Sequence, residues 1–141
     1  MKTVGIVTFE NYHQKSDIAS SRIRAKWLIK YWEEAEEFVQ GKDYEVVIYQ
    51  KVYWKEHARA FKGLKILDIC DPDWLENFPV KEFADLMNVI TVPTEALKEA
   101  LSKFTKTPVH VVKDRIDLET LPEPKIHSDD QATKAVWFGY S

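Results

Sequence analysis

The residues best suited to chemistry in this chain come directly after its β-rich apolar runs. Such runs cover residues 2–9, 45–50, 65–70, 89–93 and 109–113. In an open parallel sheet the ligand crevice lies outside the carboxyl ends of the strands, so the loops that follow them are where a site would form. The loops concerned are residues 10–21, 50–54, 71–74, 94–95 and 114–117.

The first of these loops brings hydroxyl, imidazole and charged groups to the expected start of a helix. Free amides and the positive end of a helix dipole attract hydroxyl-rich or anionic ligands there. A histidine at this point is a candidate general base, and an exposed histidine without a role is the alternative. An aspartate or serine that merely caps the helix, beside a solvated arginine, is the simpler interpretation. The residues are Tyr12, His13, Asp17, Ser20, Ser21 and Arg22.

Aromatic side chains recur on the same predicted edge of the sheet. Tyr12, Tyr53 with Trp54, and Trp74 stand on three successive loops. An aromatic ring covers the apolar face of a sugar while its edge stays hydrated, so the set suits a glycan. Each ring taken singly is also well explained by packing into the core, above all Trp54 and Trp74, which open predicted helices.

Asp68, Asp71 and Asp73 form an acidic cluster around the third apolar run. Hard cations take several carboxylate oxygens, but Asp68 falls inside the predicted strand. Asp71 precedes Pro72, which is the pattern of a helix N-cap followed by proline at the first helical position. We expect Asp71 to cap the helix or to bind substrate, with a role as catalytic base open, and we predict no metal site.

Other familiar chemistries have no support in the sequence. Neither the G-x-G-x-x-G turn of dinucleotide sites nor the G-x-x-x-x-G-K-[ST] loop occurs. Cys70 is the only cysteine, so no internal disulfide and no cysteine metal site can form. His57, His110 and His127 have no partner at ligand spacing. We therefore expect no cofactor.

The elements that must position these residues follow from apolar spacing. Residues 17–39 carry a helical pattern, and its apolar face is made of Ile23, Trp27, Leu28, Tyr31, Ala35 and Phe38. Arg22, Lys26 and Lys30 share the opposite side. A solvated helix face explains this basic row better than contact with anionic lipid.

Further helices are predicted at residues 53–62, 72–87 and 95–104. Strands that alternate with helices predict a Rossmann-like α/β domain with a parallel sheet, flanked by helices, over residues 1–120. Residues 121–134, which include two prolines, are predicted to be a connector, and residues 135–140 (AVWFGY) are predicted to form another strand. Because no helix follows that strand, we expect it to begin a second domain.

Composition limits the class of protein. Of the 141 residues, 45% are hydrophobic and 30% charged, with a net charge of −3. Such a chain is typical of a globular domain, and its near-balanced charge gives no reason to expect nucleic acid as a partner. No run approaches the ~20 apolar residues of a membrane span, so any membrane contact would be peripheral. With one cysteine and no secretory signal, the cytoplasm is the expected location.

The ordered set of segments resembles a known family. SSRIRAKWLIKYW, VVIYQK, ILDICDPDW, VITVPTEAL, VHVVKDRID and AVWFGYS are similar, in that order, to the N-terminal half of GT-B-fold glycosyltransferases of the group-1 type. The resemblance implies that this half holds a glycan or other hydroxyl acceptor. It implies further that a C-terminal half, which these residues would only begin, binds the nucleotide sugar without a required metal.

By position, the resemblance places a particular set of side chains at the cleft. They are Ser21, Arg22, Gln50, Lys51, Asp71, Thr94 and Glu95. One departure is clear: many relatives have asparagine and glycine where this chain has Asp114 and Arg115. A turn that needs positive φ at that point is therefore less well supported.

A signalling or interaction module of Rossmann type is the rival interpretation. A receiver-like domain has an acidic residue after its third strand, a threonine after the fourth and a lysine after the fifth, which Asp71, Thr94 and Lys113 match. It also needs an acidic pair after the first strand to hold Mg²⁺, and only Glu10 is available there. A stand-alone interaction domain is a third possibility.

Overall fold

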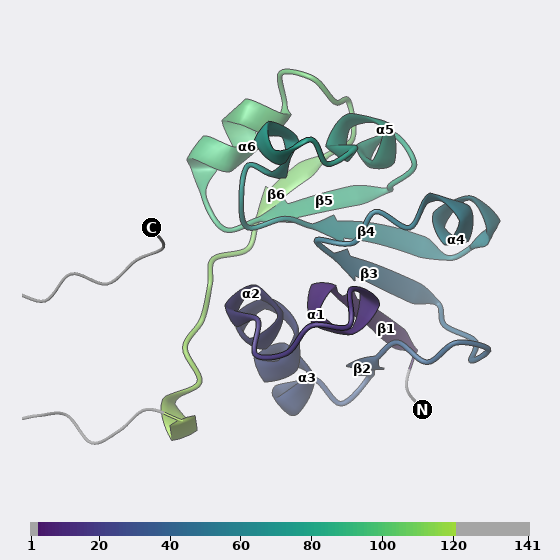
Figure 1. Ribbon diagram of the computed structural model, residues 1–141, viewed down its shortest axis with the longest axis vertical. Helices are drawn as coiled ribbons and strands as arrows, with labels where there is room; N and C mark the ends of the chain where they lie inside the picture. The colour runs from purple at the N-terminus through teal and green to yellow at the C-terminus, as the bar shows by residue number, and fades with distance from the viewer. Residues whose placement is uncertain (1–2, 121–141) are drawn as a thin grey trace, which may run out of the picture.

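The predicted α/β class is confirmed by the computed structural model, which describes residues 3–120. A six-stranded parallel sheet has the order β2-β1-β3-β4-β5-β6 (Figure 1). The strands are β1 (Val4–Thr8), β2 (Ala35–Glu37), β3 (Val46–Gln50), β4 (Leu64–Asp68), β5 (Val89–Val92) and β6 (Val109–Val111). The α-helices are α1 (Phe9–Tyr12), α2 (Ala19–Ser21), α3 (Trp27–Tyr31), α4 (Lys55–Ala60), α5 (Val80–Ala84) and α6 (Glu95–Leu101).

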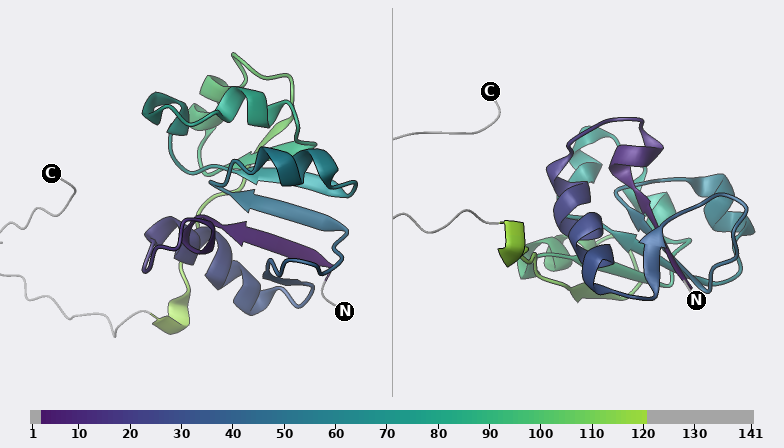
Figure 2. Two further views of the ribbon diagram at one scale, coloured as in Figure 1. Left: turned by 45° about the vertical axis from the view of Figure 1, so that its right-hand side comes forward. Right: turned by 90° about the horizontal axis from the view of Figure 1, so that it is seen from below.

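The strand order decides which helices cover which face of the sheet. The chain runs from β1 outward to β2 and then, from β3 to β6, in the opposite direction. Because crossovers between parallel strands are right-handed, the two directions put their helices on opposite faces. Figure 2 shows this arrangement, with the helix before β2 on one side and α4 on the other. On the face of the sheet where α2 and α3 lie, these helices thus cover mainly β1 and β2.

The main core lies between the sheet and helices α4, α5 and α6. Tyr49, Leu67 and Ile90 project from neighbouring strands and are fully buried against Phe83 and Leu101. A smaller cluster on the other face joins Val4, Ile6, Ala25 and Ala35. Successive side chains of a strand point to opposite faces of the sheet, as in any pleated sheet. The position of a residue in its strand therefore decides on which side of the sheet its side chain lies.

The prediction of one long helix over residues 17–39 is wrong. The helix is interrupted by a π-helical turn, Arg22–Lys26, and ends at Tyr31. Ala35 lies in β2, where it pairs with Val4 and is completely buried, and Phe38 follows that strand. Several glutamates follow Tyr31, and carboxylates at a helix C-terminus oppose the helix dipole. An edge strand that pairs with β1 therefore replaces the final helical turns.

Within the described residues, the other predicted strands and helices lie near their expected positions, and their bounds differ by a few residues. The predicted helix over residues 72–87 is split into a 3-10 helix, Asp73–Glu76, and α5. Asn77 separates them in the left-handed conformation, with φ of 63°, which asparagine tolerates better than most residues. The predicted connector and the predicted strand at 135–140 lie outside the described residues.

Gly63, between α4 and β4, packs too closely for a side chain. A Cβ atom there would lie 2.3 Å from the Glu45 carbonyl oxygen, which accepts a hydrogen bond from the Leu64 amide. We expect Gly63→Ala to lower the free energy of unfolding by about 1–3 kcal/mol, because the neighbouring backbone must move. Chemical denaturation measures the difference.

Gly41→Asn is the matched control for that measurement. Gly41 has a φ of +84°, and apart from Gly41 and its two chain neighbours no atom lies within 4 Å of the point that a Cβ atom would occupy there. Asparagine tolerates positive φ, so we expect a change below about 1 kcal/mol. Equal stability losses at both glycines would contradict the close packing at Gly63.

Candidate functional site

A polar pocket of about 420 Å³ lies at the carboxyl edge of the sheet. It is lined by residues 17–20, at the start of α2, and by Ile23, Arg24, Lys51, Cys70, Asp71 and Asp114. The loops after β1, β3, β4 and β6 therefore contribute to one concavity, as the parallel topology requires. Its lining offers ammonium and hydroxyl donors beside carboxylate acceptors.

Lys51 lines the polar pocket and is held there by bonds from its backbone and its side chain. It follows β3 in the left-handed conformation, with φ of 53°, and its amide donates to the Asp68 carbonyl oxygen at 2.9 Å. Its Nζ lies 2.5 Å from Asp71 Oδ2 and 3.2 Å from Asp73 Oδ1. Positive φ is costly for a lysine and is more frequent at functional sites than elsewhere. The backbone turn thus directs an otherwise flexible cation at two carboxylates.

The two carboxylates have different environments. Burial alone would raise the pKa of Asp71, but hydrogen bonds from Lys51 and Cys70 outweigh it and lower the pKa. Burial raises the pKa of Asp73, in spite of its contacts with Tyr53 and Lys51. Asp71 is half exposed on the pocket wall, whereas the side chain of Asp73 is buried and accepts a 2.6 Å hydrogen bond from Tyr53. Asp71 is therefore the carboxylate that a ligand can reach.

The prediction that Asp71 caps a helix is wrong. The 3-10 helix that follows begins after Pro72 and has no side-chain cap, because the Asp71 carboxylate is bound to Lys51 instead. Neither Asp17 nor Ser20 caps α2, whose N-cap is Ile18. Asp17 forms an exposed ion pair with Arg22 at 2.5 Å.

Arg24 is the central polar residue that the sequence pattern did not single out. Its guanidinium forms a forked ion pair with Asp68 of β4 and also reaches Asp114 at 2.8 Å and the Val112 carbonyl oxygen at 2.7 Å. Its side chain is only 5% exposed. Burial would lower the pKa of Arg24, but the bonds to Asp68 and Asp114 outweigh burial and raise it. Thr91 donates to Asp68 at 2.6 Å and completes the cluster.

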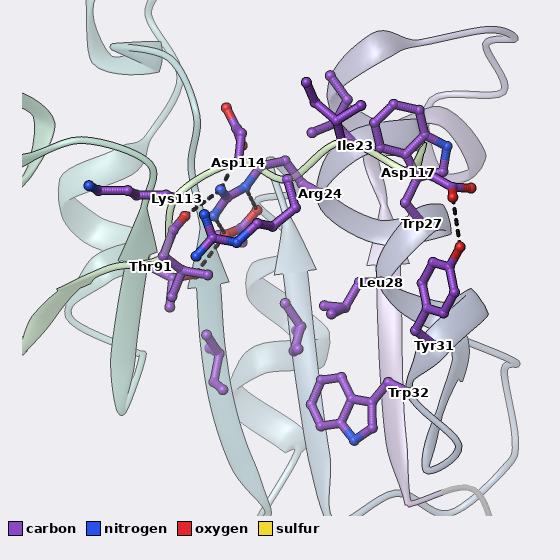
Figure 3. A pocket seen from close by; sticks show the side chains of 16 residues that line it. Ile23, Arg24, Trp27, Leu28, Tyr31, Trp32, Thr91, Lys113, Asp114 and Asp117 are labelled. Atoms are coloured by element: carbon purple, nitrogen blue, oxygen red, sulfur yellow. Dashed lines mark hydrogen bonds and ion pairs between the residues drawn. The ribbon is translucent and has the colours of Figure 1, made fainter. Parts of the chain in front are cut away.

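A second, apolar pocket of about 500 Å³ lies on the other side of Arg24 (Figure 3). Its floor is the face of the sheet that α3 leaves uncovered, at Ile48, Ile66 and Thr91. One wall is helical and the other is the segment that follows β6. The walls are made of Ile23, Arg24, Trp27, Leu28, Tyr31 and Trp32, and of residues 112–117 together with Asp68.

Ser21 and Gln50, both predicted at the cleft, are fully buried and bind to each other. Ser21 donates to Gln50 Oε1 at 2.9 Å, and the Phe9 amide donates to the same oxygen at 3.1 Å. Ser21 Oγ also accepts from the Glu10 amide at 3.1 Å. These bonds fix the backbone where β1 passes into α1. Ser21 and Gln50 therefore have a structural role, and neither of them lines the polar pocket.

The predicted aromatic platform is only partly assembled. Tyr12 and Trp54 do meet, with ring centroids 5.8 Å apart, and Tyr12 is 41% exposed. Trp54 also stacks on His57, and Trp74 packs against Phe104 on the main core. None of these rings lines the polar pocket.

His13 packs between aromatic neighbours at the end of α1. Its ring lies 4.3 Å from Phe9 and 5.1 Å from Tyr12, centroid to centroid. Partial burial, and then the positive charge of Lys15, lower the pKa of His13. It does not line the polar pocket.

The remaining predicted site residues lie apart from the polar pocket. Thr94 is the N-cap of α6 and accepts from the Leu97 amide at 3.2 Å, while Glu95 faces Lys98 on that helix. The basic row is not simply solvated: each side chain pairs with a carboxylate. The pairs are Arg22 with Asp17, Lys26 with Glu10, and Lys30 with Asp117 and Glu119.

Two other kinds of feature are absent from residues 3–120. In that part of the chain no three His, Cys, Asp or Glu side chains gather so as to hold a metal ion. In the same residues, no helix has the length and apolar character to cross a membrane. Comparison of the sequence with protein-family models and curated proteins, and of the structure with solved structures, found no match.

We predict that Arg24→Met lowers the free energy of unfolding by about 3 kcal/mol or more, because it leaves the Asp68 carboxylate buried without its cation. Arg22→Met is the matched control. The pair that Arg22 forms has side chains 44% and 87% exposed, and such pairs contribute less than about 1 kcal/mol. Chemical denaturation of both variants measures the contrast, and equal small losses would contradict a structural role for Arg24.

Cys70 provides a further test through its reactivity. Burial, and then the negative charge of Asp71, raise the pKa of the Cys70 thiol to about 12. Only the thiolate reacts, so we expect iodoacetamide at pH 8 to modify Cys70 at least ~100-fold more slowly than it modifies the unfolded chain. Asp71→Asn should accelerate the reaction, because it removes a negative charge and leaves Lys51 facing the sulfur. A native rate equal to the unfolded rate would contradict this environment.

Proposed function

We propose that this chain is the acceptor-binding half of a glycosyltransferase and that the polar pocket holds the hydroxyl groups of a glycan or other acceptor. The observation that carries the proposal is the position of that pocket, since loops from several parallel strands converge there around an ion-paired lysine and aspartate. The ordered resemblance of the sequence segments to group-1 GT-B enzymes supports the same conclusion. The nucleotide sugar would be bound by a further domain.

The lining gives each polar residue a role in binding. Asp71 accepts a hydrogen bond from an acceptor hydroxyl, and Lys51 and Ser20 offer donors to neighbouring oxygens. Such mixed donors and acceptors match sugar hydroxyls, which both donate and accept. Because the pKa of Asp71 is lowered, its carboxylate is a weak base, and it is better suited to orienting the hydroxyl than to removing its proton.

The receiver-like alternative is less well supported. The presence of β2 makes β4 the fourth strand in chain order, so Asp71 follows the fourth strand and Lys113 the sixth. Glu10, the only acid available after β1, is buried and paired with Lys26 at 2.7 Å. Phosphodonor treatment with Mg²⁺ should therefore leave Asp71 unmodified, and an acyl phosphate there would favour the receiver.

Binding of simple glycosides tests the proposed function directly. We expect methyl glycosides or short oligosaccharides from a panel to bind the chain weakly, and we expect Asp71→Ala to reduce the affinity at least ~10-fold because it removes a hydrogen bond to a charged acceptor. Glu76→Gln is the control, since Glu76 is an exposed acid outside the pocket. Isothermal titration calorimetry or ligand-observed NMR measures both.

Nucleotide sugars should behave differently from acceptors. If donor binding belongs to another domain, the chain should neither bind nucleotide sugars tightly nor transfer sugar from them. Micromolar binding of a nucleotide sugar, or loss of glycoside binding in Glu76→Gln equal to that in Asp71→Ala, would contradict the assignment.

A further inference from the structure

The polar and apolar pockets are neighbours with a common wall. Ile23, Arg24 and Asp114 line both of them. Arg24 stands between the two with its guanidinium bound to Asp68, Asp114 and the Val112 carbonyl oxygen. A ligand that occupies the polar pocket therefore has a second, chemically different cavity within reach of its other end.

Large apolar side chains that would normally be covered gather around the apolar pocket. Leu28 is 42% exposed, Tyr31 60% and Ile116 63%, and all of them line it. In Figure 3, Leu28 and Trp32 extend from the helix toward the strands. Exposed apolar patches of this kind often mark binding surfaces. The volume of the apolar pocket, about 500 Å³, is within the range of small-ligand sites.

The apolar pocket has walls that are fixed by specific bonds. The segment after β6 runs past the α2–α3 helix (Figure 1) and is tied to it at both ends. Arg24 holds the Val112 carbonyl oxygen at 2.7 Å, while Lys30 and Tyr31 hold Asp117 at 2.8 and 2.6 Å. The cavity between them is therefore a property of the fold.

The charged groups of the apolar pocket belong to its walls, and its floor at Ile48, Ile66 and Thr91 carries none. Arg24 is bound to Asp68 and Asp114, and Asp117 is bound to Lys30, while Lys113 and Arg115 line the wall that follows β6. Placing a charged group inside would remove it from water without a free partner at the floor, where Ile48 and Ile66 lie. The occupant that fits is an uncharged apolar group.

We propose that the acceptor is an amphiphile: its hydroxyl-bearing part lies in the polar pocket and an uncharged apolar aglycone lies in the apolar pocket. This inference rests on the proposed function and names the substrate class for it. The observation that carries the inference is that the two pockets are neighbours, since Ile23, Arg24 and Asp114 line both of them. The aglycone contributes only binding and orientation.

A series of alkyl glucosides with lengthening chains tests the proposal. Calorimetric titration of the whole chain with methyl, butyl, hexyl and octyl glucoside, each below its micellar concentration, should show affinity that rises about 4-fold per added methylene until the cavity is full. Alkanols of the same lengths are the companion series, and they should bind at least ~10-fold more weakly because they lack the sugar hydroxyls.

Matched variants locate the apolar end of the ligand. Leu28→Glu puts a charge into the apolar pocket and should remove the dependence on chain length while methyl glucoside binds as before. Leu75→Glu is the control, because Leu75 is 73% exposed and lies outside both pockets, and it should leave the series unchanged. Ile116→Glu, at the opposite wall of the apolar pocket, should act like Leu28→Glu.

The outcomes separate this inference from the proposed function. Methyl glucoside binding without any gain from longer chains would overturn the amphiphile and leave the function standing. Alkanols that bind as tightly as the glucosides would overturn both. A further outcome would also overturn the inference: a gain in affinity with chain length that is seen only in the Trp137→Ala variant. Residues 135–140 of the chain itself would then compete with the alkyl group for the apolar pocket.

Discussion

The buried ion pair between Arg24 and Asp68 holds the edge of this domain together. It joins the π-helical turn before α3 to the middle of the sheet, and through Asp114 and Val112 it also holds the segment after β6. Breaking such a pair leaves an uncompensated charge, whereas the intact pair contributes little net stability. Its main consequence is geometric, since it fixes three segments that are far apart in sequence and divides the crevice into two pockets.

Topology explains why the two pockets differ. Parallel strands deliver their following loops to one edge, so polar residues such as Lys51 and Asp71 meet there. The reversal of strand order at β1 and β3 leaves part of one sheet face without a helix, and Ile48 and Ile66 are exposed to the apolar pocket. One edge of a small sheet thereby offers a hydrogen-bonding surface beside an apolar one.

Most of the fold could be predicted from the sequence, but the edge strand β2 could not. Apolar runs located β1, β3, β4, β5 and β6 because buried parallel strands are apolar on both faces. β2 has only the residues Ala35–Glu37, and a short edge strand with two glutamates has no such signal. Ala35 and Phe38 also fit the helical spacing, so only pairing with β1 distinguishes the two structures.

The candidate site was predicted as a region more successfully than as a set of residues. The rule that ligands bind beyond strand ends found Ser20, Lys51 and Asp71, because topology alone brings them together. It could not show that Gln50 turns inward to Ser21. Arg24 was missed although a signal existed: it stands three and four residues before Trp27 and Leu28, so it is a charge on an apolar helix face. The aspartate inside the strand KILDIC was its partner.

Mapping of amide chemical shifts during titration with a bound glycoside tests the central claim most directly. If the acceptor lies in the polar pocket, the largest changes will cluster at residues 17–24, at Lys51, at Cys70 and Asp71, and at Asp114. Changes centred on α4, α5 and α6, on the far face of the sheet, would contradict the account.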